Sequence, residues 1–193
     1  LEYVNTTFRQ ITDGFIKENL GMLHKAEETM RRKRDELKNC RRKEMVGFRR
    51  IDPEVAMEKN TWFHLGRNSC EEILYCLRRI ADPCEEHVDN NFVPLSKEQV
   101  KEYIPLRDTV LFLLRRTEKI LQTDSYDEVD EVRREAEELK DCLEKAREAQ
   151  MQRMQSSKEN IAVAYLYLNL LQETRELTSS LRHLLRASKG FRE

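Results

Sequence analysis

The clearest periodicity in the chain lies between Phe63 and Val88. Apolar or small residues recur there at steps of three and four, the spacing that places side chains on one face of an α-helix. These residues are Gly66, Cys70, Ile73, Leu77, Ile80, Cys84 and Val88. The spacing predicts one amphipathic helix, whose Gly66, Ile73, Leu77 and Ile80 face the centre of a bundle.

Helical spacing also covers the rest of the chain. Residues 3–46 read as one long helix or two, with Gly14 and Gly21 as weak points. Asp52 and Pro53 have the residue types of a helix start, so the helix that contains the stripe is expected to run from there to about residue 90. Pro83 is expected to kink that helix.

Capping residues separate the remaining helices. Ser96 and Gln99 fit a capping box for a helix that reaches about residue 121. Asp124 or Ser125 is expected to cap the next helix, in which Val129, Val132, Ala136, Leu139, Leu143 and Ala146 form a heptad pattern. A last helix is expected to begin after residues 155–157 and to run to about residue 187. Since short loops make neighbouring helices antiparallel, we predict an all-α antiparallel bundle of five to six long helices.

Composition agrees with this fold class and limits the function. The chain has 193 residues, of which 39% are apolar and 37% charged, which suits one helical domain. A subdivision into residues 1–92 and 96–193 stays open. No Gly-rich phosphate loop, His-Glu-x-x-His motif or nucleophile elbow occurs, so we expect neither an enzyme nor a cofactor. The net charge of −1 gives no case for a nucleic-acid partner.

The cysteines and the chain start indicate the cellular setting. Five cysteines without Cys-x-x-Cys spacing argue against a disulfide framework and a zinc site, and favour a reducing compartment. Cys70 and Cys84 lie on the apolar stripe, where thiols act as small hydrophobic groups. No apolar run has the length of a membrane span. Because the chain starts with Leu1 instead of methionine and leads straight into helical spacing, we expect upstream sequence to be missing.

Two short motifs give the chain a family resemblance. Residues 77–83 (LRRIADP) resemble the Glu-Arg-Ile-Gly/Ala-Asp signature of the PhoU family of phosphate-signalling helical bundles. Residues 167–171 (YLNLL) resemble the family's Tyr-Leu-Asp-Leu-Leu. Residues 75–80 and 171–177 occupy comparable places near the ends of two helices, which suggests an internal duplication. The resemblance implies two three-helix bundles, each presenting an acidic i, i+4 pair that binds a metal ion.

Both acidic pairs are altered in this chain. The aligned positions hold Arg78 with Asp82, and Arg175 with Ser179, so each pair lacks its first carboxylate. An arginine offers no lone pair to a cation, and we therefore expect no metal at these positions. Arg78 and Asp82 are expected to form an i, i+4 ion pair instead.

The closer similarity is to the PhoU-like tail that follows the membrane domain in bacterial Na⁺/phosphate cotransporter family proteins. It implies a cytoplasmic regulatory or coupling domain at the inner membrane, which acts by protein–protein or membrane-surface contact. The implied partner is the transmembrane half of its own transporter, so the resemblance implies that the missing upstream sequence is a transmembrane region. A free-standing PhoU-like metal-binding regulator of phosphate signalling and an unrelated helical scaffold remain alternatives, and a homodimer stays open.

Basic residues crowd one stretch of this nearly neutral chain. We treat seven of them as a candidate interaction surface: Arg31, Arg32, Lys33, Arg34, Arg41, Arg42 and Lys43. Such a surface suits anionic inner-leaflet lipid, where each basic residue contributes about 1 kcal/mol. It could equally pair with the acidic helix of residues 127–138, or remain solvated.

Two smaller clusters complete the candidates. His64, Arg67 and Asn68 form a candidate polar pocket for an anion or a partner's carboxylate. The alternative is aromatic packing around Trp62, with His64 bonded to a backbone carbonyl. The cluster around His87 reads as a solvated acidic helix end rather than a metal site, because consecutive helical residues point apart.

Overall fold

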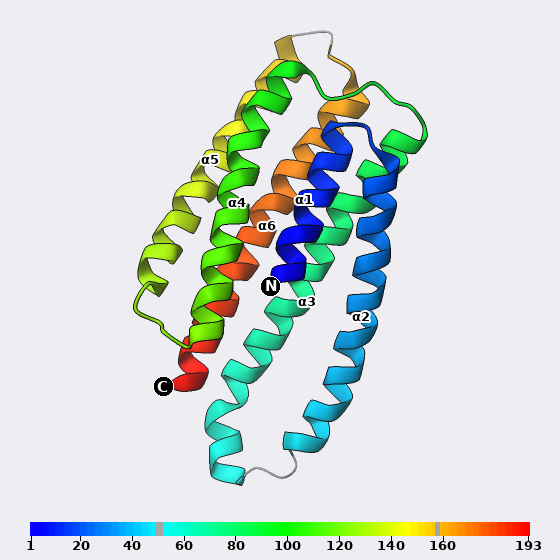
Figure 1. Ribbon diagram of the computed structural model, residues 1–193. Coiled ribbons are helices and arrows are strands. Elements are labelled where there is room, and N and C mark those ends of the chain that lie inside the picture. The colour runs from blue at the N-terminus through cyan, green and yellow to red at the C-terminus, as the bar shows by residue number, and fades with distance from the viewer. Residues whose placement is uncertain (49–51, 157–158) are drawn as a thin grey trace.

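A computed structural model describes residues 1–48, 52–156 and 159–193, apart from the side chains of Arg42, Met45 and Phe48. These residues form α-helices and no strand: α1 (Glu2–Ile16), α2 (Leu20–Phe48), α3 (Pro53–Asp89), α4 (Lys97–Thr123), α5 (Val129–Ser156) and α6 (Ile161–Arg192). Consecutive helices run in opposite directions along one elongated bundle (Figure 1). The predicted all-α bundle of five to six helices is confirmed.

The helices pack as two units of three. Helices α1, α2 and α3 contact one another, and α4, α5 and α6 do the same. The two units meet where α3 packs along α6 and α1 lies against α4. One continuous hydrophobic core contains residues of both halves of the chain. The boundary at residues 92–96 therefore separates two packing units that share a core.

The apolar stripe of α3 lies in that core as predicted. Ile73, Leu77 and Ile80 are each at most 2% exposed. A Cβ atom placed on Gly66 would lie 3.5 Å from the Cβ of Ala187, so Gly66 faces α6. The stripe is thus the buried face of α3, and at Gly66 it lies against α6.

The first segment forms two helices, which settles the open alternative. The break falls between the two glycines, at residues 17–19, where Glu18 adopts a φ of 49°. Asn19 starts α2 by accepting a 3.1 Å hydrogen bond from the backbone N–H of Met22. Gly14 lies inside α1, where a Cβ would come within 3.0 Å of the Leu23 side chain. It permits close approach of α1 and α2 rather than breaking the helix.

The predicted caps are confirmed at two helix starts. The Asp52 carboxylate accepts from the backbone N–H of Glu54 at 2.9 Å, with Pro53 in the first turn of α3. Ser96 and Gln99 exchange both bonds of a capping box, at 2.9 and 3.1 Å. The helix α3 continues through Pro83 to Asp89.

Other boundaries differ from the prediction. Asp124 is the left-handed residue that ends α4, and α5 begins at Val129, so neither Asp124 nor Ser125 caps it. A left-handed residue after a helix satisfies terminal carbonyls, which competes with a role as the next N-cap. The last helix continues five residues beyond the expected end, to Arg192.

The acidic end of α3 is less solvated than the sequence suggested. His87 is only 6% exposed, and its Nε2 lies 2.7 Å from the backbone oxygen of Val93. The rings of Phe15 and Phe92 pack edge-on against its imidazole. His87 therefore fastens the loop after α3 to the core, while its acidic neighbours stay at the surface.

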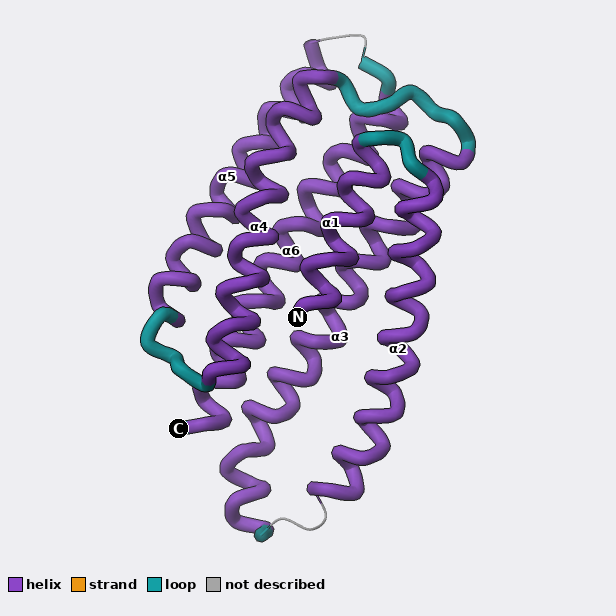
Figure 2. Tube along the Cα trace, in the orientation of Figure 1, coloured by secondary structure: helices purple, strands orange, loops and turns teal. Residues whose placement is uncertain are grey.

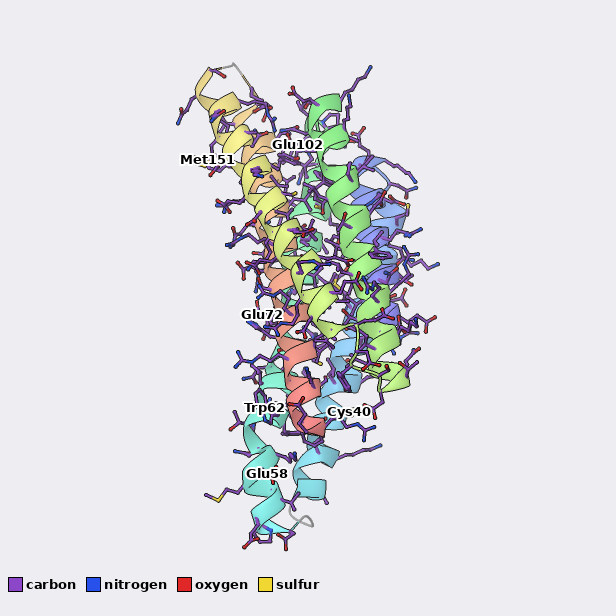
Figure 3. All side chains as sticks on the ribbon, turned by 90° about the vertical axis from the view of Figure 1, so that its left-hand side faces the viewer. Cys40, Glu58, Trp62, Glu72, Glu102 and Met151 are labelled. Atoms are coloured by element: carbon purple, nitrogen blue, oxygen red, sulfur yellow. The ribbon has the colours of Figure 1, made fainter. Side chains whose placement is uncertain are left out.

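The helix α2 is the least embedded of the long helices. Its described buried side chains are Leu23, Ala26 and Met30, all in its first three turns. The lower parts of α2 and α3 extend beyond the other helices (Figures 1 and 2). Figure 3 shows Trp62 beside the C-terminal end of α6. Glu58, which is nearer the start of α3, lies beyond that end. We call residues 40–48 of α2 and 53–62 of α3 the projecting hairpin.

Candidate functional site between α2 and α3

A groove of about 480 Å³ runs between α2 and α3 and continues into the projecting hairpin. Apolar side chains from both helices lie at its base: Met30, Leu37, Cys70 and Leu74. Met30 is buried and the other three are half-buried. Tyr75 stands beside them with 57% of its surface exposed. We call this feature the α2–α3 groove.

The groove has a predominantly basic rim. Arg31, Arg34, Lys38 and Arg41 of α2 line it, and Arg67 and Arg78 of α3 do so as well. On α2 these residues follow steps of three and four, which place them on one helical face. Four carboxylates lie among them: Glu27, Glu44, Glu71 and Asp82. The rim thus has an excess of two positive charges.

Several rim charges are paired along their own helices. Arg31 binds Glu27 at 2.8 Å, and Arg67 lies 3.8 Å from Glu71. Outside the lining, Asp35 lies 3.7 Å from Lys38. Such exposed pairs contribute only about 0–1 kcal/mol each. They can therefore exchange partners at little cost.

Arg34 and Arg41 are different, because neither has an ion-pair partner among the described residues. Both are exposed and line the groove on either side of Leu37. They stand two helical turns apart, about 10 Å along α2. The groove therefore presents two arginines without an ion pair beside an apolar base, and Glu44, one turn beyond Arg41, is its carboxylate without an ion pair among the described residues.

The thiol in the groove is not activated. Burial raises the pKa of Cys70, so its thiol is protonated at neutral pH. A protonated thiol is a poor nucleophile and a poor metal ligand. The role of Cys70 here is that of a small apolar side chain, as the sequence predicted.

The positions that the resemblance aligns with acidic pairs lie between α2 and α3 in the first unit and between α5 and α6 in the second. The predicted i, i+4 pair is confirmed, since Arg78 donates to Asp82 at 3.0 Å beside the α2–α3 groove. Arg175 lies between α5 and α6, 3.7 Å from Glu144, and Ser179 is half-buried one turn farther along α6. Within the described residues no three His, Cys, Asp or Glu side chains are grouped as metal ligands. The lack of metal at these positions stays a prediction.

The candidate polar pocket is only partly assembled. Arg67 lines the α2–α3 groove, whereas His64 and Asn68 are exposed and do not line it. Trp62 packs on α6, where a Cβ on Gly190 would come within 2.5 Å of its indole ring. The structure therefore favours aromatic packing at this end of α3.

The candidate interaction surface divides between two faces of α2. Arg31, Arg34 and Arg41 line the groove, whereas Arg32 and Lys43 are exposed and lie outside it. Lys33 turns towards α1, 5.6 Å from the centre of the Tyr3 ring. The side chain of Arg42 lies outside the described residues.

Pairing of this surface with the acidic helix is wrong. Among the described residues, α2 contacts α1 and α3 but not α5, and α5 lies against α4 and α6. The acidic start of α5 instead surrounds Arg116 of α4, which bonds Glu128, Glu131 and Glu135 at 2.7–3.0 Å. Periodicity gives the face of a helix but not its neighbour, so the sequence could not distinguish these partners.

The sequence analysis missed two features of the site. The apolar base went unnoticed because Met30 and Leu37 are isolated among charged residues, although their spacing of seven was a usable signal. It also missed Arg79, which donates to Glu173 of α6 and to Glu72, both at 2.7 Å. Glu173 is only 8% exposed, so this pair joins the two units next to the groove.

Comparisons with known proteins add no relative. No protein-family model, curated protein or solved structure matches the chain. Across residues 1–48, 52–156 and 159–193, no helix combines the length and apolarity needed to cross a membrane. The functional argument therefore starts from the groove and the sequence motifs.

Proposed function

We propose that this chain is a regulatory or coupling domain that acts by binding a protein partner through the α2–α3 groove. The observation that supports the proposal is the pair of arginines without ion-pair partners among the described residues, Arg34 and Arg41, beside a half-buried apolar base. Arginine and tyrosine around a desolvated centre are typical of residues that dominate protein interfaces, and Tyr75 supplies the tyrosine.

The partner class follows from the family resemblance. A PhoU-like tail of a bacterial Na⁺/phosphate cotransporter would contact the transmembrane half of its own transporter at the cytoplasmic face of the inner membrane. Two observations support this assignment. The chain forms two units of three helices, and the altered motif positions lie between the second and third helix of each unit. A metal-binding regulator is less favoured, because Arg78 already neutralises Asp82.

A coiled-coil scaffold is also less favoured. The heptad of α5 would have to be available to a partner, but Val132, Leu139 and Leu143 are each at most 3% exposed inside the bundle. They pack in the core formed with α4 and α6. The proposed interaction surface is therefore on α2, not on α5.

The test is phosphate uptake by cells whose own gene carries substitutions in this domain. Charge reversal at the groove (R34E/R41E) should change the rate of sodium-dependent phosphate uptake, because it removes both free cations. Reversal on the other side of α2 (R32E/K43E) is the matched control and should leave uptake unchanged. Equal protein amounts are verified by immunoblot. Unchanged sodium-dependent uptake in R34E/R41E would contradict the proposal.

A further inference from the structure

The α2–α3 groove has the shape of a seat for a helix. Along α2 its lining extends from Glu27 to Glu44, which corresponds to about 25 Å of helix. Along α3 it extends from Arg67 to Asp82. A groove of this length between two helices matches a helix of about 17 residues lying along it.

The second unit of the molecule shows what a closed seam looks like. There α5 packs along α6 through Val132, Ala136, Leu139, Leu143 and Ala146, which are all buried. In the first unit, the described side chains of α2 beyond Met30 are exposed or half-buried. The first unit therefore leaves apolar surface uncovered in the seam that the second unit closes.

The charge pattern indicates what kind of helix fits. Arg34 and Arg41 are seven residues apart with Leu37 between them, and all three line the groove. A helix packed at a small crossing angle presents its own residues at the same spacing of seven. Carboxylates at that spacing would meet both arginines, while an apolar residue between them would cover Leu37.

We propose that the α2–α3 groove binds an acidic amphipathic helix of the partner protein, with carboxylates seven residues apart beside an apolar stripe. This rests on the proposed function and names the chemistry of the partner. The apolar stripe covers the groove base, and the carboxylates pair with Arg34 and Arg41. Glu27 and Asp82 keep their own arginines, Arg31 and Arg78, at one end of the groove.

An anionic membrane is a poorer occupant of this surface. Binding to a negatively charged lipid surface depends on the summed charge of the basic residues rather than on the position of each one. Summed charge would therefore make Arg32 and Lys43 as important as the groove arginines, although they lie outside the groove. The two occupants thus differ in which face of α2 they require.

The experiment uses fluorescein-labelled peptides of about 18 residues, long enough to span the groove. The acidic peptide is alanine-based, with leucines at steps of three and four and two glutamates seven residues apart. The control peptide has lysines in place of the glutamates. Fluorescence anisotropy titrations measure binding to the parent protein, to R34E/R41E and to R32E/K43E. Both variants should keep their far-UV CD, because glutamate is a good helix former.

The parent and R32E/K43E should bind the acidic peptide at least about tenfold more tightly than the lysine peptide, as two opposite charges at a rim allow. The variant R34E/R41E should reverse this preference. An absent preference in the parent, or equal losses in both variants, would overturn the inference. A second assay measures sedimentation of the parent and both variants with anionic vesicles. If both variants lose vesicle binding equally, the surface binds lipid and the inference is overturned. If uptake responds to R34E/R41E while the acidic peptide fails, the proposed function stands and the helix inference falls.

Discussion

Replacing Leu77 by alanine should lower the free energy of unfolding by about 2–5 kcal/mol, as truncations of buried leucines do. The side chain of Leu77 is fully buried on the stripe of α3 that faces the shared core. The loss combines the apolar surface no longer buried with the cavity that remains, because helices α3 and α6 cannot close around it. Urea denaturation followed by CD at 222 nm measures the change.

The matched control for this prediction is Val55→Ala on the same helix. Val55 is 47% exposed at the projecting end of α3, so its truncation should cost less than about 0.5 kcal/mol. Similar effects of the two substitutions would mean that the stripe of α3 does not face the core. The pairing of α3 with α6 would then be wrong.

Replacing Arg79 by methionine should destabilise the protein by about 1–3 kcal/mol at neutral pH. The methionine keeps much of the side-chain volume but removes the guanidinium that donates to Glu173 at 2.7 Å. Glu173 is only 8% exposed, so its carboxylate would remain buried between α3 and α6 without its cation. The expected loss of unfolding free energy is smaller than for a fully buried ion pair, because the Arg79 side chain is 42% exposed.

Two further variants separate this pair from the surface bridge of the same arginine. Glu72→Gln removes the exposed partner of Arg79 and should cost under about 1 kcal/mol. The double variant R79M/E173M should regain much of the stability lost in R79M, because no buried charge is left unpaired. An R79M variant as stable as E72Q would show that water, not Arg79, solvates Glu173.

The helices were predictable because each signal for them is local. The stripe from Gly66 to Val88 and the capping box at Ser96 depend on residues within a few turns of one another. The chain reversal near Glu18 was harder to place, because its backbone conformation and the close approach at Gly14 depend on α2 lying against α1.

The candidate site was predictable only in part, because it depends on which helices become neighbours. The sequence correctly marked Arg31, Arg34, Arg41, Arg67 and Arg78 as unusual, but placed them in three separate clusters. Packing of α2 against α3 brings all five to one groove. The same packing leaves Arg32 on another face, which no count of charges along the chain reveals.

Arg79 and His87 show the same limit for single residues. Arg78 attracted attention through the motif, yet its neighbour Arg79 reaches across to α6 because it points a further 100° around the helix. His87 follows Glu85 and Glu86 along the chain, but Phe15 and Phe92 cover it in space. Glu173 and Phe15 are distant in sequence from the residues that they contact, so neither environment can be read from the local sequence.

The central claim is that the first unit leaves open the seam that the second unit closes, and amide hydrogen exchange tests it most directly. Amides exchange fastest where few buried apolar contacts hold a helix in place. We predict that residues 31–41 of α2 exchange much faster than residues 132–146 of α5 in the same sample, and become protected when the acidic peptide is bound. Equal protection of the two segments in the free protein would contradict the claim.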